Sequence, residues 1–195
     1  MELLQQHNLS LKPEKCEFKK LSMEYLGVVV FHDSVKMDPV KVAGVTEWPI
    51  LTNKKEVQLF LGFTNFYRRF IEGFSHVACP LFNLTKADSI FHWSMEEQLA
   101  FDTLRERITS APILTLPDNS RPYHVEADSS DFATGAVLSQ ECPEDGKWHP
   151  VAFLSKSLSP VKRNYSSRQA KPACFLNKLF GQLQRSRWVL NVKIQ

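Results

Sequence analysis

The amino-acid sequence predicts an α+β fold in which a helical unit is flanked by antiparallel strands. Three observations support this prediction. A run of β-branched and aromatic residues lies near the N-terminus, capping signatures precede apolar-periodic segments in the middle, and three short strand-like segments separated by turn residues follow. With 195 residues, 43% hydrophobic and 23% charged, the chain is globular in composition and long enough for one ordinary domain or two small ones.

The N-terminal part, residues 1–31, is predicted to be extended after the end of a helix. A turn is expected at Lys12-Pro13-Glu14, followed by a short extended segment at 16–19 and a strand over 23–31. The pattern begins in mid-element and has no core of its own. We therefore expect this part to be the last piece of a larger domain.

The middle part, residues 32–117, is predicted to be helical, with about four helices. Prolines bracket a short helix over 40–47, and longer apolar-periodic helices are expected over 57–70 and 95–108. A polar N-cap residue with a glutamate three positions later precedes each longer helix, which is the pattern of a capping box. These pairs are Asn53 with Glu56 and Ser94 with Glu97.

The third part, residues 118–165, is predicted to be an antiparallel meander. Its strands are expected at 123–127, 135–140 and 148–154, and a polar turn joins the second to the third. Beyond it the apolar pattern degrades into a divergent basic tail, residues 166–195.

Charge is divided unevenly along the chain, although the net charge is only +3. Residues 1–145 carry 14 Lys or Arg against all 21 Asp and Glu, whereas residues 146–195 carry ten Lys or Arg and no acid. Because the last 50 residues have no carboxylate, acid–base chemistry or binding of a hard metal ion must depend on residues upstream.

The cysteines and the N-terminus predict an intracellular protein, in the cytoplasm or the nucleus. Four dispersed cysteines form no Cys-x-x-Cys pair and have no histidine at zinc spacing, so they are interpreted as thiols rather than a disulfide framework. The longest apolar run has four residues, 28–31, and no basic segment followed by an apolar core opens the chain. We therefore expect neither a membrane span nor a secretory signal.

A polar stripe is predicted along the helix that begins near Asn53. At about 100° per residue, six residues fall within one arc, with Phe66 at its margin. They are Lys54, Lys55, Gln58, Gly62, Asn65 and Arg69. A solvated face is the simpler interpretation on charge alone. However, a mid-helix glycine costs about 1 kcal/mol relative to alanine, and the neighbouring side chains suit a minor groove and phosphates. These features favour a nucleic-acid contact.

Asp128 is the candidate metal ligand. A strand that ends in this aspartate, turns and returns through Gly135 would hold a carboxylate at a fixed position, as Mg²⁺ sites require. The alternative is that Asp128-Ser129-Ser130-Asp131 is simply a turn, because such residues favour turns.

Several motifs, taken in order, carry a family resemblance. From residue 1 to Tyr165 the sequence resembles the Pol polyprotein of gypsy-type LTR retrotransposons, over the end of the reverse-transcriptase palm, the thumb and the first half of the RNase H domain. The motifs lie at 11–18, 24–27, 60–71 and 126–140. The implied fold is a β-hairpin palm remnant (1–31), a helical thumb (32–117) and a truncated RNase H-like antiparallel meander (118–165), followed by the tail.

The resemblance implies roles for specific residues. Tyr25, Leu26 and Gly27 match the primer grip, which holds the primer 3′ end. Gln58, Gly62 and Phe66 match thumb positions that track the minor groove of the template–primer duplex, and Lys15 matches a lysine near the incoming nucleotide. Asp128 matches the first carboxylate of an RNase H site, where two Mg²⁺ ions act in hydrolysis of the RNA strand of an RNA–DNA hybrid.

The sequence departs from the family at both catalytic sites. After Asn164-Tyr165 the family carries a second carboxylate seven residues beyond the asparagine, where this chain has Lys171, and Pro172 would disturb the helix. No Asp-Asp pair of the palm occurs in the sequence. We therefore expect neither site to assemble from this chain alone, and no Mg²⁺ to bind stably.

The leading hypothesis is a fragment of a retrotransposon reverse transcriptase and RNase H, an RNA-directed DNA polymerase that also hydrolyses RNA in hybrids, inactive by itself. One alternative is a non-catalytic nucleic-acid-binding module that retains the thumb helix, and another is a structural subunit that completes another Pol chain. The expected partners are an RNA–DNA hybrid or template–primer duplex and the remainder of a Pol polyprotein. The loss of pattern near residue 166 is typical of a frameshift or a misread splice junction.

Overall fold

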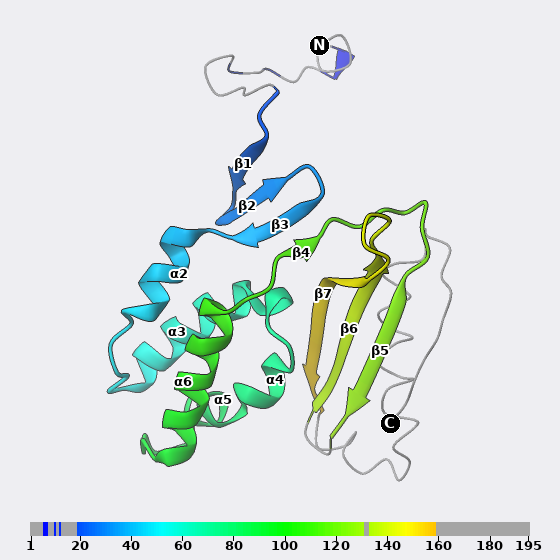
Figure 1. Ribbon diagram of the computed structural model, residues 1–195. Helices are drawn as coiled ribbons and strands as arrows, with labels where there is room; N and C mark the ends of the chain where they lie inside the picture. Colours follow the sequence, from blue (N-terminus) through cyan, green and yellow to red (C-terminus); the bar gives the residue numbers. More distant parts are fainter. Residues whose placement is uncertain (1–5, 8–9, 11, 13–18, 131–132, 159–195) are drawn as a thin grey trace.

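The computed structural model describes residues 6–7, 10, 12, 19–130 and 133–158. In chain order, a group of helices comes between the first three strands and the last four, and the strands form two antiparallel sheets. The prediction of an α+β fold is confirmed. Figure 1 shows the helices on one side of the molecule and the three C-terminal strands beside them. Pro13 and Glu14 of the predicted turn, residues 16–18 of the predicted extended segment and the basic tail, 166–195, lie outside the described residues.

The first sheet has the order β1 (Ser22–Tyr25), β2 (Val28–Phe31), β3 (Ser34–Met37) and β4 (Leu114–Thr115). The prediction of one strand over 23–31 is therefore wrong, because the chain reverses between β1 and β2. Strands β3 and β4 also fall in the region predicted to be helical. Strand β4 joins the sheet from far along the chain through only two residues, which no local periodicity could indicate.

The helices follow the predicted capping signals. Asn53 accepts a hydrogen bond from the Glu56 amide at the start of the long helix α3, and Ser94 with Glu97 forms a complete capping box on α6. Within residues 32–117, all of which the structure describes, there are five α-helices where about four were predicted. They are α2 (Pro39–Thr46), α3 (Lys54–Phe66), α4 (Phe74–Val77), α5 (Cys79–Leu84) and α6 (Met95–Thr109), with a 3₁₀ turn, η2 (Arg68–Phe70), after α3.

A single apolar core lies between the helices and the first sheet. Its fully buried aromatic members come from α3, η2, α4 and α6, and Val35, Met37 and Leu114 contribute from the sheet. Phe60 and Phe101 pack with their ring centroids 4.7 Å apart. This core fixes α3 so that its opposite side faces outward.

The second sheet is formed by β5 (His124–Ser129), β6 (Ala133–Glu141) and β7 (Trp148–Ser157). Strands β6 and β7 extend beyond their predicted ranges, whereas β5 starts one residue later and ends two residues later than predicted. Alternate residues divide the sheet into two faces. One face buries a small cluster, and the other carries Asp128 together with its cross-strand neighbour Gly135.

Strand β7 attaches the second sheet to the helices. Phe153 packs against the helical core, the buried Ser155 hydroxyl accepts a 2.9 Å hydrogen bond from the Ser75 amide, and the Arg68 guanidinium donates to the Ser155 carbonyl. Because Ser155 pairs with Gly135, the face that carries Asp128 is turned toward the helices.

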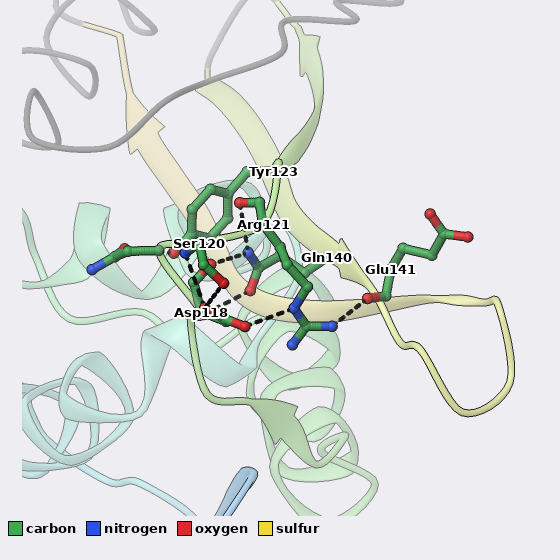
Figure 2. A network of polar contacts seen from close by, with 7 residues as sticks. Asp118, Ser120, Arg121, Tyr123, Gln140 and Glu141 are labelled. Atoms are coloured by element: carbon green, nitrogen blue, oxygen red, sulfur yellow. Dashed lines mark hydrogen bonds and ion pairs between the residues drawn. The ribbon is translucent and has the colours of Figure 1, made fainter.

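A polar network fastens the segment before β5 to the end of β6 (Figure 2). The Asp118 carboxylate accepts from the hydroxyl and amide of Ser120, at 2.6 and 2.9 Å, and from Arg121 Nε at 2.8 Å. Arg121 also donates to the Glu141 carbonyl, and the buried Gln140 amide bonds both the amide and the carbonyl of Asp118. The hydrogen bonds that the Asp118 carboxylate accepts from Ser120, and after them the bond and charge of Arg121, lower the pKa of Asp118 to about 2.

Candidate nucleic-acid interface

The β1–β2 turn presents two exposed side chains on a strained backbone. Leu26 and Gly27 both have positive φ, 49° and 80°, the conformation of a two-residue type I′ hairpin turn. The side chains of Tyr25 and Leu26 are 59% and 69% exposed. The three residues predicted for the primer grip therefore lie at one tight turn.

Tyr67 joins this turn to the end of α3. Its hydroxyl donates a 3.0 Å hydrogen bond to the Gly27 carbonyl oxygen, which also accepts from the Asp38 amide at 3.2 Å. A Cβ at Gly27 would lie 2.6 Å from the Tyr67 hydroxyl oxygen, so only glycine allows this approach. Burial, with a smaller contribution from the Asp38 carboxylate, raises the pKa of Tyr67, so the phenol stays protonated as a donor.

The outer face of α3 continues from this junction. Gln58, Gly62 and Asn65 are exposed, and Phe66 is 56% exposed with its ring edge-on to the buried Tyr67 at 4.9 Å. An added Cβ at Gly62 would meet nothing within 4 Å, so the helix backbone is open to an approaching molecule there. The structure thus brings the turn and the middle of the predicted stripe together.

The basic residues of the predicted stripe do not form one continuous row along α3. Lys54 donates from its ammonium group to the carbonyls of Lys86 and Ala87, at 2.9 and 3.4 Å. Lys55 is exposed. Arg69 does not continue the helical arc, because α3 ends at Phe66 and the chain tightens into η2. The prediction that the helix continues to residue 70 is therefore wrong.

Asp128 lines a cleft of about 740 Å³ between the second sheet and the helices. It is exposed on β5, and Glu126 lies two residues before it on the same face, across from Glu72 and His76. Within the described part of the chain, Asp128 belongs to no group of three close metal-ligating side chains. These residues therefore do not supply a two-metal site.

Lys15, the remaining predicted site residue, lies outside the described residues. Sequence reasoning did not identify Tyr67 as a functional residue. It also missed Arg68, which binds the carbonyl of Ser155 in the second sheet. Neither has a local signal, since both act on backbone oxygens far away in the sequence.

Comparisons with known proteins agree with these features. Residues 93–179 match the family described as the RNase H-like domain found in reverse transcriptase. The chain is 38% identical over 161 residues to the retrovirus-related Pol polyprotein from transposon 297 of Drosophila melanogaster, covering 82% of this chain and 15% of that protein. It is 36% identical over 175 residues to the corresponding polyprotein of transposon opus of the same species, covering 84% of this chain and 17% of the relative. The Gag-Pol polyprotein of baboon endogenous virus is 38% identical over 149 residues, covering 76% and 8%.

Solved structures show the same fold. The foamy viral protease-reverse transcriptase in complex with an RNA/DNA hybrid superimposes with a TM-score of 0.74 at 18% identity, over 93% of this chain and 25% of that one. Its complex with double-stranded DNA gives 0.71 at 19% identity, over 90% and 37%.

This chain thus spans less than a fifth of the Pol and Gag-Pol polyproteins named above. No helix among the described residues is both long and apolar enough to cross a membrane.

Proposed function

We propose that this chain, which is homologous to the reverse transcriptase and RNase H region of retrotransposon Pol polyproteins, binds a template–primer or RNA–DNA duplex through the β1–β2 turn and the outer face of α3. We further assign it to the gypsy type, on the order of its motifs. In this proposal residues 1–31 end the palm, 32–117 form the thumb and 118–165 begin the RNase H-like domain.

The observation that carries the proposal is the hydrogen bond from Tyr67 to the Gly27 carbonyl. It holds the exposed Tyr25–Gly27 turn against the end of α3, beside Phe66. A duplex that lies along α3 would then meet the turn without rearrangement of the protein. Such preorganisation reduces the entropy lost on binding.

The chemistry of this surface suits the minor groove and the sugar–phosphate backbone. The side-chain amides of Gln58 and Asn65 can donate and accept hydrogen bonds, Phe66 offers an apolar surface, and the bare backbone at Gly62 permits close approach. Because residues 1–145 are acidic overall, affinity here depends on these contacts more than on general charge attraction.

Fluorescence anisotropy with a labelled RNA–DNA hybrid tests the proposal. We expect Phe66→Ala to weaken binding at least about fivefold, the effect of losing about 1 kcal/mol at a contributing interface residue. Phe82→Ala is the matched control, since Phe82 is also partly exposed and its ring also packs edge-on against a buried aromatic, Phe74. Equal effects of the two substitutions would contradict the proposal.

Catalysis by this chain alone is not part of the proposal. In the intact family a divalent metal pair, which we take to be Mg²⁺, would include Asp128 among its ligands, but the described residues do not complete such a site. We therefore expect duplex binding without cleavage of the hybrid. Mg²⁺-dependent cleavage that is abolished by Asp128→Asn would contradict this expectation.

A further inference from the structure

The turn between β6 and β7 brings together three side chains of different chemistry. Its backbone is closed by hydrogen bonds from the Cys142 amide to the Lys147 carbonyl, at 2.8 Å, and from the Gly146 amide to the Cys142 carbonyl, at 2.9 Å. Gly146 adopts φ +63°, which a residue with a side chain rarely does. The conformation of this turn is therefore set by the backbone.

Asp145, in the turn, and His149, at the start of β7, are already oriented toward each other. One Asp145 carboxylate oxygen accepts a 3.0 Å hydrogen bond from the Lys147 amide. The other oxygen lies 2.9 Å from His149 Nε2. Among the described residues, Cys142, Asp145 and His149 form the one group of three potential ligands, with their ligand atoms all within 4.8 Å of one another.

We propose that Cys142, Asp145 and His149 bind a divalent transition-metal ion, with Zn²⁺ as the expected occupant. A thiolate, an imidazole and a carboxylate suit zinc, whereas Mg²⁺ and Ca²⁺ prefer oxygen ligands alone. Bonds of about 2.0–2.3 Å to a tetrahedral centre place the ligand atoms roughly 3.2–3.8 Å apart. The present spacing, within 4.8 Å, is at most about 1 Å wider than that range.

The site is accessible and is separate from Asp128. Cys142 and His149 are half-buried and Asp145 is exposed, so an ion can enter from solvent while the other two ligands are held. Asp128 pairs with Gly135 near the start of β6, and Cys142 follows the end of that strand. Cys142 is seven positions beyond Gly135, which at about 3.3 Å per residue corresponds to roughly 23 Å along the strand direction.

Three protein ligands leave one coordination position for water. Bound metal would link the end of β6 to the start of β7 across the turn. Metal binding should therefore stabilise the hairpin, because an ion that binds the folded state shifts the unfolding equilibrium. Zinc at saturating concentration should raise the thermal midpoint of the full-length protein.

Titration of the reduced, full-length protein with Co²⁺ tests the site, because a cobalt–thiolate bond gives a near-ultraviolet charge-transfer band. We expect the band in the wild-type protein, its loss in Cys142→Ser and its retention in Cys79→Ser, the other thiol in the described residues. Absence of the band from the wild-type protein would overturn the proposal. Its persistence in Cys142→Ser, or equal loss in both variants, would also overturn it.

A second set of variants keeps the thiol and tests the other ligands. By competition with a zinc-binding dye, His149→Gln and Asp145→Asn should each weaken Zn²⁺ binding at least about tenfold. His92→Gln, an exposed histidine elsewhere, should not. Circular dichroism checks the fold of every variant. Folded His149→Gln protein with wild-type zinc affinity would contradict the assignment.

Discussion

Single side chains decide how the two parts of the proposed duplex surface are joined. Tyr67 is 3% exposed, yet its hydroxyl reaches across to the β1–β2 turn, and Gly27 has no side chain that would prevent the contact. The glycine was identified through its match to the primer grip, although its positive φ was not predicted. The tyrosine could not be recognised from the sequence, because its partner is a backbone oxygen 40 residues away.

Tyr67→Phe tests this contact. Loss of the hydroxyl should lower the free energy of unfolding by about 1 kcal/mol and weaken hybrid binding, because the turn is no longer held to α3. Urea denaturation and anisotropy measure the two effects. Tyr123→Phe, which removes a hydrogen bond of 3.0 Å to Asn119, should lower stability without changing hybrid binding. Unchanged hybrid binding in Tyr67→Phe would show that the hydrogen bond from Tyr67 to Gly27 does not contribute to hybrid binding.

The lowered pKa of Asp118 predicts that the stability of the protein depends on pH. Its pKa is lowered from an ordinary 3.8 to about 2 in the folded protein, so its contribution to stability is fully present above about pH 4 and is lost as the pH falls toward 2. Asp118→Asn should therefore destabilise the protein at pH 7, and the difference from wild type should shrink between pH 4 and pH 2. Urea denaturation at several pH values measures this difference. With Asp88→Asn, an exposed control, stability should stay close to wild type throughout, and a constant deficit in Asp118→Asn would contradict the assignment.

At the scale of elements, capping signatures predicted the starts of α3 and α6 well, because those signals are local. Strand pairing was predicted less well. The run over 23–31 contains no proline, asparagine or aspartate to mark a turn, so its residues alone did not indicate the reversal at Leu26. Strand β4 depends on a partner far away in the sequence. The ligand group in the β6–β7 turn was missed because Cys142, Asp145 and His149 match no familiar zinc spacing, and only the hairpin register places them together.

Gly62 gives helix α3 a prediction in which stability and binding change in opposite directions. Gly62→Ala should raise the free energy of unfolding by up to about 1 kcal/mol, because alanine favours helix and the space for its methyl group is open. The same methyl group should weaken binding of an RNA–DNA hybrid by blocking close approach. Gly44→Ala in α2 is a matched control, since that position is also open, and it should only stabilise. Tighter hybrid binding by Gly62→Ala would refute a close backbone contact.

At the scale of the whole molecule, the second sheet is attached to the helices through β7. Ser155 supplies both a hydroxyl for the Ser75 amide and a carbonyl for Arg68, while β5, with Asp128, borders the open cleft. The order of the elements was predictable from the sequence. This attachment was not, because the Arg68 guanidinium and the Ser155 hydroxyl each pair with a backbone group at least 80 residues away.

Ser155→Ala tests the attachment. It leaves the buried Ser75 amide without its acceptor, which should cost about 1–3 kcal/mol and make the helices and the sheet unfold less cooperatively. Tryptophan fluorescence and far-ultraviolet circular dichroism during urea denaturation should then give separate midpoints. Ser157→Ala, at the exposed end of the same strand, is the control. Coincident, unshifted midpoints in Ser155→Ala would show that the interface does not depend on this hydroxyl.

The Gly27 carbonyl accepts from Tyr67 and from the amide of Asp38, so a main-chain atom holds the turn to both α2 and α3. A main-chain oxygen survives every substitution. Mutations can therefore accumulate around this joint during sequence drift without removing it, provided that position 27 stays glycine and position 67 keeps its hydroxyl. In a diverging copy of this sequence, substitution at position 27 or 67 would be the first sign that the proposed duplex surface has been lost.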